Sequence, residues 1–266
     1  MSELDDPVVL LGRGGSGTRL LAQLGAANGV FIGNDVNASG DSLEWVDDLY
    51  ALAIECVTSG VEADSERDAF WRAALVGRAR AVLEAAGRDA GAPWGWKLPE
   101  TMLGLPQVLR AFPRARIVHL IRHPVSSSLR RSHMTSRADN AVGRAVLAAA
   151  YDACGLDPNV AADDPDDVRN AMTWEFQMRG ALDALAALPD GARLLQLRYE
   201  VVCADPAAAL DRIAAFLGLP APDRASAPVI DERRSQPIAG DGERAARVWA
   251  LCGATGARLG YRPPPG

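Results

Sequence analysis

The sequence has few of the residues that build metal sites or disulfide frameworks. It contains three histidines and four cysteines, and the cysteines lie far apart without a CxxC pair. No histidine is spaced with cysteines or carboxylates as zinc ligands are. Long apolar runs and a secretory signal are also missing. These absences predict a cytoplasmic, metal-independent protein without a membrane partner, whose cysteines are reduced and mostly buried.

Lysine is scarce as well. The net charge is −6 at pH 7, and the chain has a single lysine, Lys97. An acidic balance argues against nucleic acid as a partner, but it is compatible with a local basic pocket. The 266 residues, of which 48% are hydrophobic, fit one domain with a full core. We expect a single domain over residues 1–266, with a helical insertion at about 34–92.

The stretch VVLLGRGGSGTRLL, residues 8–21, is the most informative motif. It predicts a buried strand over Val8–Leu11, a glycine-rich loop and then a helix, an arrangement that directs backbone N–H groups at a phosphate. The spacing of Gly12 and Gly17 matches the first half of a P-loop. A nucleotide triphosphatase continues with lysine and a metal-binding hydroxyl, whereas this chain has Thr18 and Arg19. The loop therefore predicts a site for an anionic nucleotide without the usual Mg²⁺ ligand.

Three later stretches place a cation or a tyrosine at the end of a predicted strand. The short strand that begins at Trp94 and ends at Pro99 contains Lys97. The apolar strand Arg116–Ile121 is followed by Arg122, and the strand Arg193–Arg198 is followed by Tyr199. Strands that alternate with helices imply a parallel sheet covered on both faces. The prediction is an α/β, three-layer, P-loop-like fold with a central parallel sheet flanked by helices. Ligands of such sheets bind at the carboxyl ends of the strands, where these residues should meet.

Apolar periodicity predicts the helices between these strands. We expect Pro124 to start one of them, and the polar segment Asp152–Asp167 to form a loop that could act as a lid. In the helix over Asp166–Leu188, Met172, Phe176, Leu182 and Leu185 should point inward. Further helices are expected from Leu43 to Ala53, Glu66 to Arg88, Met102 to Phe112, Pro206 to Leu217 and Glu243 to Leu259.

In this order, the motifs resemble the sulfotransferases that use 3′-phosphoadenosine 5′-phosphosulfate (PAPS). GRGGSGTRLL resembles their 5′-phosphosulfate loop, in a variant closer to the carbohydrate and tyrosyl-type enzymes than to the cytosolic phenol-type branch. WKLPE and FPRARIVHLIRHP resemble the Lys-x-Pro segment and the strand before the 3′-phosphate motif. LLQLRYEVVCADPAAALDRIAAFLGL is similar to the family's Tyr-Glu strand end and following helix. The tail from Arg233 to Tyr261 resembles the closing loop and last helix of bacterial members, and the alanine- and arginine-rich composition also suggests a bacterial source.

The resemblance implies that PAPS is the donor and that 3′-phosphoadenosine 5′-phosphate (PAP) is the product. Two departures affect the site. Gly15 stands where many members carry a cation, and Arg130 stands where a serine usually follows Arg122 by eight residues. We therefore expect Arg130, Ser126 and a helix N-terminus to share the 3′-phosphate. The implied cofactor-binding residues are Arg13, Gly14, Gly15, Ser16, Gly17, Thr18, Arg19, Arg122, Ser126, Arg130, Tyr199, Arg233 and Arg234.

Transfer of a sulfuryl group can proceed with fixed N–H donors and cations, without Mg²⁺. Lys97, Arg13 or Arg19 would stabilise the charge that develops on the leaving nucleotide. A hydroxyl acceptor also needs a general base. The resemblance places it in the segment after the first helix, where our order of preference is Asp41, Asp35 and then Glu44; Glu100 and His133 are rivals. His119 lies within an apolar strand and is expected to be a core residue.

Two other functions stay open at this point. An atypical P-loop kinase lacks the required lysine and Mg²⁺-binding hydroxyl in the loop. A non-catalytic nucleotide-binding protein is compatible with the unusual Gly15 and Arg130. The acceptor is expected to be a small molecule, and an alcohol, a sugar, a phenol or a natural-product scaffold would each fit.

Overall fold

One parallel sheet organises the structure. A computed structural model of the chain describes residues 6–88, 91–130, 132–188, 191–230 and 242–264. Within this part, four strands pair in the order β2–β1–β3–β4, and every pair is parallel. The carboxyl ends of the strands therefore lie along one edge of the sheet. The strands are β1 (Val8–Leu11), β2 (Gly95–Trp96), β3 (Arg116–Ile121) and β4 (Leu194–Arg198).

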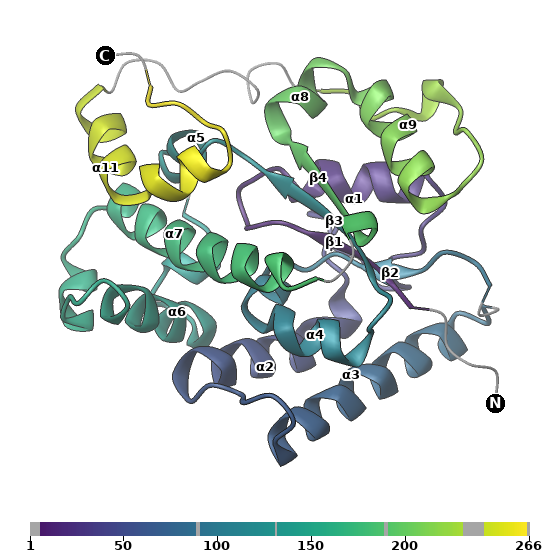
Figure 1. Cartoon of the computed structure of the whole chain (residues 1–266), viewed down its shortest axis with the longest axis horizontal. Coiled ribbons are helices and arrows are strands. Elements are labelled where there is room, and N and C mark those ends of the chain that lie inside the picture. Colours follow the sequence, from purple (N-terminus) through teal and green to yellow (C-terminus); the bar gives the residue numbers. More distant parts are fainter. Residues whose placement is uncertain (1–5, 89–90, 131, 189–190, 231–241, 265–266) are drawn as a thin grey trace.

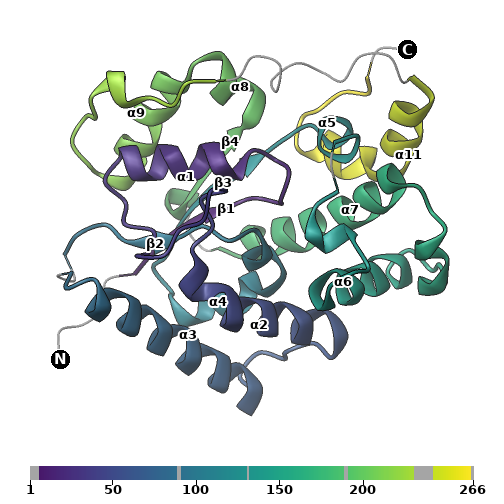
Figure 2. The same cartoon turned by 180° about the vertical axis from the view of Figure 1, so that it is seen from behind.

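Alternation along the strands divides the core into two halves. Successive side chains of a strand point to opposite faces of the sheet. On one face, Leu10 and Leu120 pack with α1 (Thr18–Ala27) and α9 (Pro206–Leu217). On the other face, Val9 and Ile117 belong to a larger cluster with the remaining long helices. Figures 1 and 2 show the sheet between these helical layers, which confirms the predicted three-layer α/β fold.

The larger cluster is built around tryptophans. Trp45 stacks on Trp96 with 4.1 Å between ring centroids, and both side chains are fully buried. Trp45 precedes α2 (Val46–Thr58), which α3 (Glu66–Ala85) follows, so two helices separate α1 from β2 as expected. The same half of the core contains α4 (Leu105–Ala111), α7 (Asp166–Ala186) and α11 (Gly242–Arg258). Two short helices complete the carboxyl edge, α5 (Pro124–Ser128) and α8 (Tyr199–Ala204).

Some sequence expectations are wrong in detail. A helix that the periodicity did not predict, α6 (Ala141–Asp152), follows an Asn140 cap, and part of the expected loop after it forms a 3₁₀ helix over Pro158–Ala162. In α7, Phe176 is only half-buried, whereas Leu182 packs against the core as expected. The cysteines form no disulfide, but only Cys252 is buried.

No helix among the described residues combines the length and the apolar character needed to cross a bilayer.

Candidate active site

The carboxyl edge of the sheet brings the four motifs together. The glycine loop follows β1, Lys97 follows β2, Arg122 follows β3, and Tyr199 follows β4. Because the strands are parallel and adjacent, segments that are far apart in the sequence meet at this edge. Pro124 is the first residue of α5, as expected.

The glycine loop is in close contact with two rings because Gly14 and Gly17 have no side chains. A Cβ atom at Gly14 would lie 2.0 Å from the His133 ring, and one at Gly17 would lie 2.3 Å from the Tyr199 ring. Gly17 also has φ +95°, a conformation that favours glycine. It precedes α1, whose N-terminus has no side-chain cap. The first N–H groups of this helix are therefore suited to an anion.

Arg13 is a buried cation beneath the loop. Its side chain is 1% exposed, and Nη2 donates to Ser136 Oγ at 2.7 Å and Thr173 Oγ1 at 2.9 Å. Its Nη1 donates to Gly14 O at 3.1 Å. Burial lowers the pKa of Arg13 to about 10, so the guanidinium stays charged at neutral pH. Among the described residues no carboxylate pairs with it, and the positive charge is held by neutral oxygens alone.

Arg122 and Tyr199 form the opposite wall of the loop. The Arg122 guanidinium lies 4.1 Å from the centroid of the Tyr199 ring, and its Nη1 donates to Gly15 O at 3.4 Å. Burial, followed by the charge of Arg130, lowers the pKa of Arg122. Burial raises the pKa of Tyr199 to about 12. Gly15 therefore lacks a side-chain cation of its own but lies between the guanidinium groups of Arg13 and Arg122.

Lys97 and Asp41 form an ion pair, so two predicted catalytic residues are brought together. Lys97 is 1% exposed, and its Nζ donates to Asp41 Oδ1 and, at 2.8 Å, to Ser39 O. Burial lowers the pKa of Lys97, and the hydrogen bond to Asp41 opposes this effect. The second Asp41 oxygen accepts from Asn37 Nδ2 at 3.0 Å.

The other two acidic candidates of this segment are placed differently. Glu44 Oε1 accepts from the backbone N–H groups of Asn34 at 2.6 Å and Asp35 at 3.0 Å, so it shapes the loop. Asp35 is exposed. The Ser42 hydroxyl donates to Ile32 O and accepts from the Lys97 N–H, so it connects this segment to the residue after β2.

Glu100 and His133 lie beside this ion pair. Glu100 is 1% exposed, and burial, with a smaller effect from Asp41, raises its pKa to about 7. His133 Nε2 is 3.7 Å from Glu100 Oε1. Burial and then the charge of Arg13 lower the pKa of His133 to about 3. Tyr50, which no sequence motif indicated, donates to Met134 Sδ at 3.2 Å, and its pKa is raised by burial and by Glu100 and Asp41.

A buried polar row on α7 was also missed. Asn170, Thr173 and Gln177 are fully or almost fully buried and recur at helical spacing. Thr173 binds Arg13, and Gln177 Nε2 donates to Thr135 Oγ1 at 3.1 Å. Polar residues at three- and four-residue spacing were the available signal, but only the tertiary contacts reveal their partners.

The remaining cofactor-binding candidates lie around the same edge. Ser126 and Arg130 are half-buried, on and just after α5. The N–H of Val125 donates to His123 Nδ1 at 3.2 Å, so a side chain caps this short helix. Arg19 is exposed and lines a hollow of about 280 Å³ with Gly17, Leu20, Gln23, Tyr199, Val229 and Ile230. Arg233 and Arg234 lie outside the described residues.

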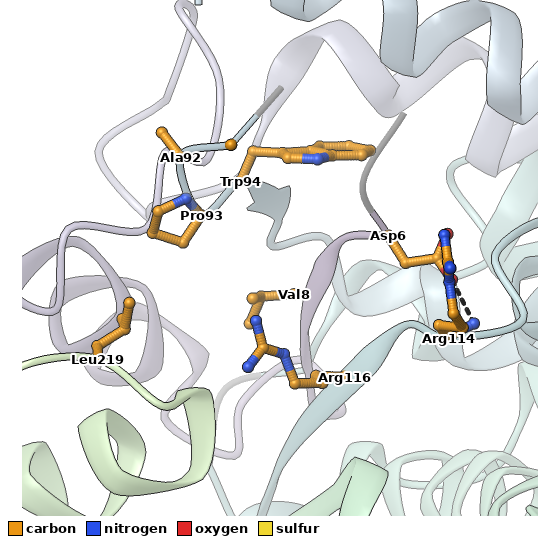
Figure 3. Close-up of a pocket in the computed structure, with 9 residues that line it drawn as sticks. Asp6, Val8, Ala92, Pro93, Trp94, Arg114, Arg116 and Leu219 are labelled. Atoms are coloured by element: carbon orange, nitrogen blue, oxygen red, sulfur yellow. Dashed lines mark hydrogen bonds and ion pairs between the residues drawn. The ribbon is translucent and has the colours of Figure 1, made fainter. Parts of the chain in front are cut away.

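A second hollow lies at the other end of the sheet. Its volume is about 350 Å³, and its lining includes Val8 and Arg116 at the starts of β1 and β3 (Figure 3). Arg114 and Asp6 interact at its margin. Since ligands of parallel sheets bind at the carboxyl ends of the strands, this hollow is not part of the candidate active site.

Gly17→Ala should lower the free energy of unfolding by about 1–3 kcal/mol, because alanine disfavours the left-handed backbone and its Cβ meets the Tyr199 ring. Urea denaturation measures this change. Gly77→Ala is the matched control: Gly77 lies inside α3 with open space around it, and alanine should stabilise that helix by about 0.5–1 kcal/mol. Equal destabilisation of both variants would show that the backbone conformation of Gly17 and its contact with Tyr199 impose no special requirement for glycine.

Glu100→Gln should remove a pH dependence of stability. The Glu100 pKa is about 7 in the folded chain, against about 4.3 in an unfolded one. The folded state therefore holds the proton more tightly, and the free energy of unfolding falls by about 3 kcal/mol as the pH rises from about 4 to 7. Urea denaturation at pH 5 and pH 8 should show a smaller loss in Glu100→Gln than in the wild type. The same loss in both proteins would show that Glu100 does not titrate in this range.

Comparisons with known proteins agree with this geometry. The family model described as "Sulfotransferase family" matches residues 7–223. The sulfotransferase domain from the curacin biosynthetic pathway is 17% identical, with a TM-score of 0.52, over 99% of this chain and 100% of that one. The sulfotransferase STF1 from Mycobacterium tuberculosis H37Rv is 14% identical, with a TM-score of 0.50, over 95% of this chain and 77% of that one.

STF9 from Mycobacterium avium is 13% identical, with a TM-score of 0.50, over 85% of this chain and 67% of that one. The search of curated protein sequences found no match. At these identities the structural neighbours support the fold, whereas the family model covers most of the chain, including all four strand ends. The chain belongs to the sulfotransferase family.

Proposed function

We propose that the protein transfers the sulfuryl group of PAPS to a hydroxyl group of a small-molecule acceptor. The observation that carries the proposal is the pairing of a bare glycine loop with buried cations. Arg13 and Arg122 reach the loop from two sides, and Lys97 lies at the end of the neighbouring strand. Such an arrangement favours a ligand with several negative charges.

The residues of the site fit such a donor. A Cβ atom at Gly15 would meet only Arg13 Nη1, at 3.8 Å, so the space above the loop is open. The uncapped N-terminus of α1 and the Arg13 guanidinium would hold the 5′-phosphosulfate. Tyr199 and Arg19 line the hollow beside the loop, which is suited to the nucleoside. Arg122, Arg130 and Ser126 are the proposed partners of the 3′-phosphate.

Lys97 is the proposed stabiliser of the leaving nucleotide. When bound, PAPS supplies the sulfuryl group that is transferred. Lys97 is held by Asp41 and Ser39 O, so its ammonium is already oriented by the segment before α2. A preorganised cation at a developing negative charge is typically worth about 3 kcal/mol of barrier. Asp41 keeps the buried ammonium paired until that charge develops.

The kinase alternative lacks a specific observation in its favour. The single lysine of the chain follows β2 rather than the glycine loop. The hydroxyl position after the loop lysine of a P-loop enzyme is occupied by Arg19. A site without these groups is better suited to sulfuryl transfer than to Mg²⁺-dependent phosphoryl transfer.

PAP should stabilise the protein far more than ADP or Mg²⁺-ATP. A ligand present at about 100 times its dissociation constant adds about 2.7 kcal/mol to the free energy of unfolding. Thermal unfolding with each nucleotide measures the effect. Equal shifts with ADP, or a shift that requires Mg²⁺, would argue for the kinase. Binding of PAP without transfer from PAPS to a panel of alcohols, sugars and phenols would favour a non-catalytic nucleotide-binding protein.

Lys97→Met should keep PAP binding and lose about 10²–10³ in turnover, as expected for a charge that acts in the transition state. Because Lys97 is the only lysine, protein labelled with ¹⁵N-lysine gives one side-chain ammonium signal, which should shift when PAP is added. Arg72→Met, on the exposed face of α3, is the control and should retain full turnover. Normal turnover of Lys97→Met would remove Lys97 from the mechanism.

A further inference from the structure

A carboxylate with one unpartnered oxygen is buried next to the proposed sulfuryl-transfer site. Glu100 Oε1 has no hydrogen-bond partner among the described atoms, although the side chain is 1% exposed. Burial without a hydrogen bond is costly for a carboxylate, and a bound proton relieves that cost. The group that faces this oxygen is His133 Nε2, at 3.7 Å.

His133 connects this buried carboxylate to the surface of the site. Its side chain is 21% exposed, whereas that of Glu100 is 1% exposed. The ring lies against Gly14 of the loop, and its Nδ1 accepts from the Thr135 N–H. This contact leaves Nε2 directed toward Glu100. The pair therefore extends from the interior to the loop on which the donor is proposed to lie.

Asp41 is less suited to accept a proton than its position in the sequence indicated. One of its oxygens binds Lys97 Nζ, and the other accepts from Asn37 Nδ2. Protonation of Asp41 would break its ion pair with a lysine that is itself 1% exposed. Glu100 has no comparable partner to lose.

We propose that Glu100 and His133 together accept the proton of the acceptor hydroxyl. This inference rests on the proposed sulfotransferase activity. The acceptor oxygen forms a bond to sulfur while the bond between sulfur and the nucleotide's phosphate oxygen breaks, and the bonding electrons leave with the nucleotide. The acceptor proton passes to the Glu100 carboxylate, whose free Oε1 faces His133 Nε2, and it leaves to solvent past the exposed edge of His133. Catalytic hydrogen bonds that are long in the free enzyme can shorten when substrate binds.

Charges from several segments face the pair and set where its proton resides. Lys97 favours ionised Glu100, whereas Asp41 disfavours it. Around His133, Asp41 favours the protonated ring, but the positive charges disfavour it. A neutral ring beside a titrating carboxylate is the arrangement that these charges support. The facing groups are Asp41, Lys97, Tyr50 on α2, Arg13 of the loop, and Arg137 after the 3₁₀ helix Met134–Ser136.

NMR of the histidine rings tests the pairing without any substrate. The chain has three histidines, and His133→Asn identifies the His133 signals. These signals should show an inflection near pH 7, from ionisation of Glu100, which is absent in Glu100→Gln. Glu175→Gln is the control: Glu175 binds Thr255 on α11, away from the pair, and its substitution should leave the inflection in place. An inflection that survives in Glu100→Gln overturns the proposal.

Acceptors of different acidity test the chemistry. Pentafluorophenol is ionised at neutral pH and needs no general base. Phenol keeps its proton at neutral pH and therefore needs one. Glu100→Gln and His133→Asn should each lose at least ~100-fold in turnover with phenol but little with pentafluorophenol. Both variants should still be stabilised by PAP, which shows that they fold. If Asp41→Asn shows this selectivity and Glu100→Gln does not, Asp41 is the base.

The outcomes separate the inference from the function on which it rests. Failure of wild-type protein to bind PAP, or to transfer sulfate to any acceptor of the panel, refutes the proposed sulfotransferase. Normal sulfation of phenol by Glu100→Gln refutes the Glu100–His133 pair alone. Wild-type protein could sulfate other acceptors but neither phenol nor pentafluorophenol. In that case the NMR titration decides: an inflection that disappears in Glu100→Gln supports the pair, and one that survives refutes it.

Discussion

The bare backbone of the glycine loop is the constraint on which the rest of the site depends. His133 lies on Gly14 and Tyr199 on Gly17, at distances that leave no room for a Cβ atom. Arg122 reaches the loop at the carbonyl of Gly15. These three side chains come from segments after β3 and β4, so the loop after β1 contacts residues that follow the adjacent strand and the strand beyond it. A side chain on the loop would displace the aromatic residues and fill the space that an anion needs.

Two different solutions to buried positive charge occur at this edge. Arg13 is surrounded by hydroxyl and carbonyl oxygens and so retains its field beneath the loop. Lys97 is instead neutralised by Asp41. An anionic donor therefore meets a fixed cation at Arg13 and a cation that must change partners at Lys97. In a protein of net charge −6, this local concentration of positive charge attracts an anion that the rest of the surface repels.

The architecture could largely be predicted because its signals are local. The apolar run Val8–Leu11 and the strand Arg116–Ile121 are confirmed at the predicted residues, and α9 covers the predicted range Pro206–Leu217. The helix Ala141–Asp152 was missed, although Val142, Val146 and Leu147 recur at helical spacing and are buried. In α7, burial of Asn170 and Thr173 contradicts the apolar pattern because their side chains bind groups that are distant in the sequence. Thr173 Oγ1 accepts from Arg13, and Asn170 Nδ2 donates to Ser128 O.

The sequence by itself determined the order of the strands, the glycine-rich loop after the first of them, and the cation or tyrosine near each of the other strand ends. Those features follow from residue types within a few positions of one another. Only the tertiary structure decided which charges meet: Asp41 with Lys97, and Glu100 with His133. Each pair joins segments that become neighbours only when parallel strands align their ends. Pairing between distant segments depends on where the chain returns, and no local pattern contains that information.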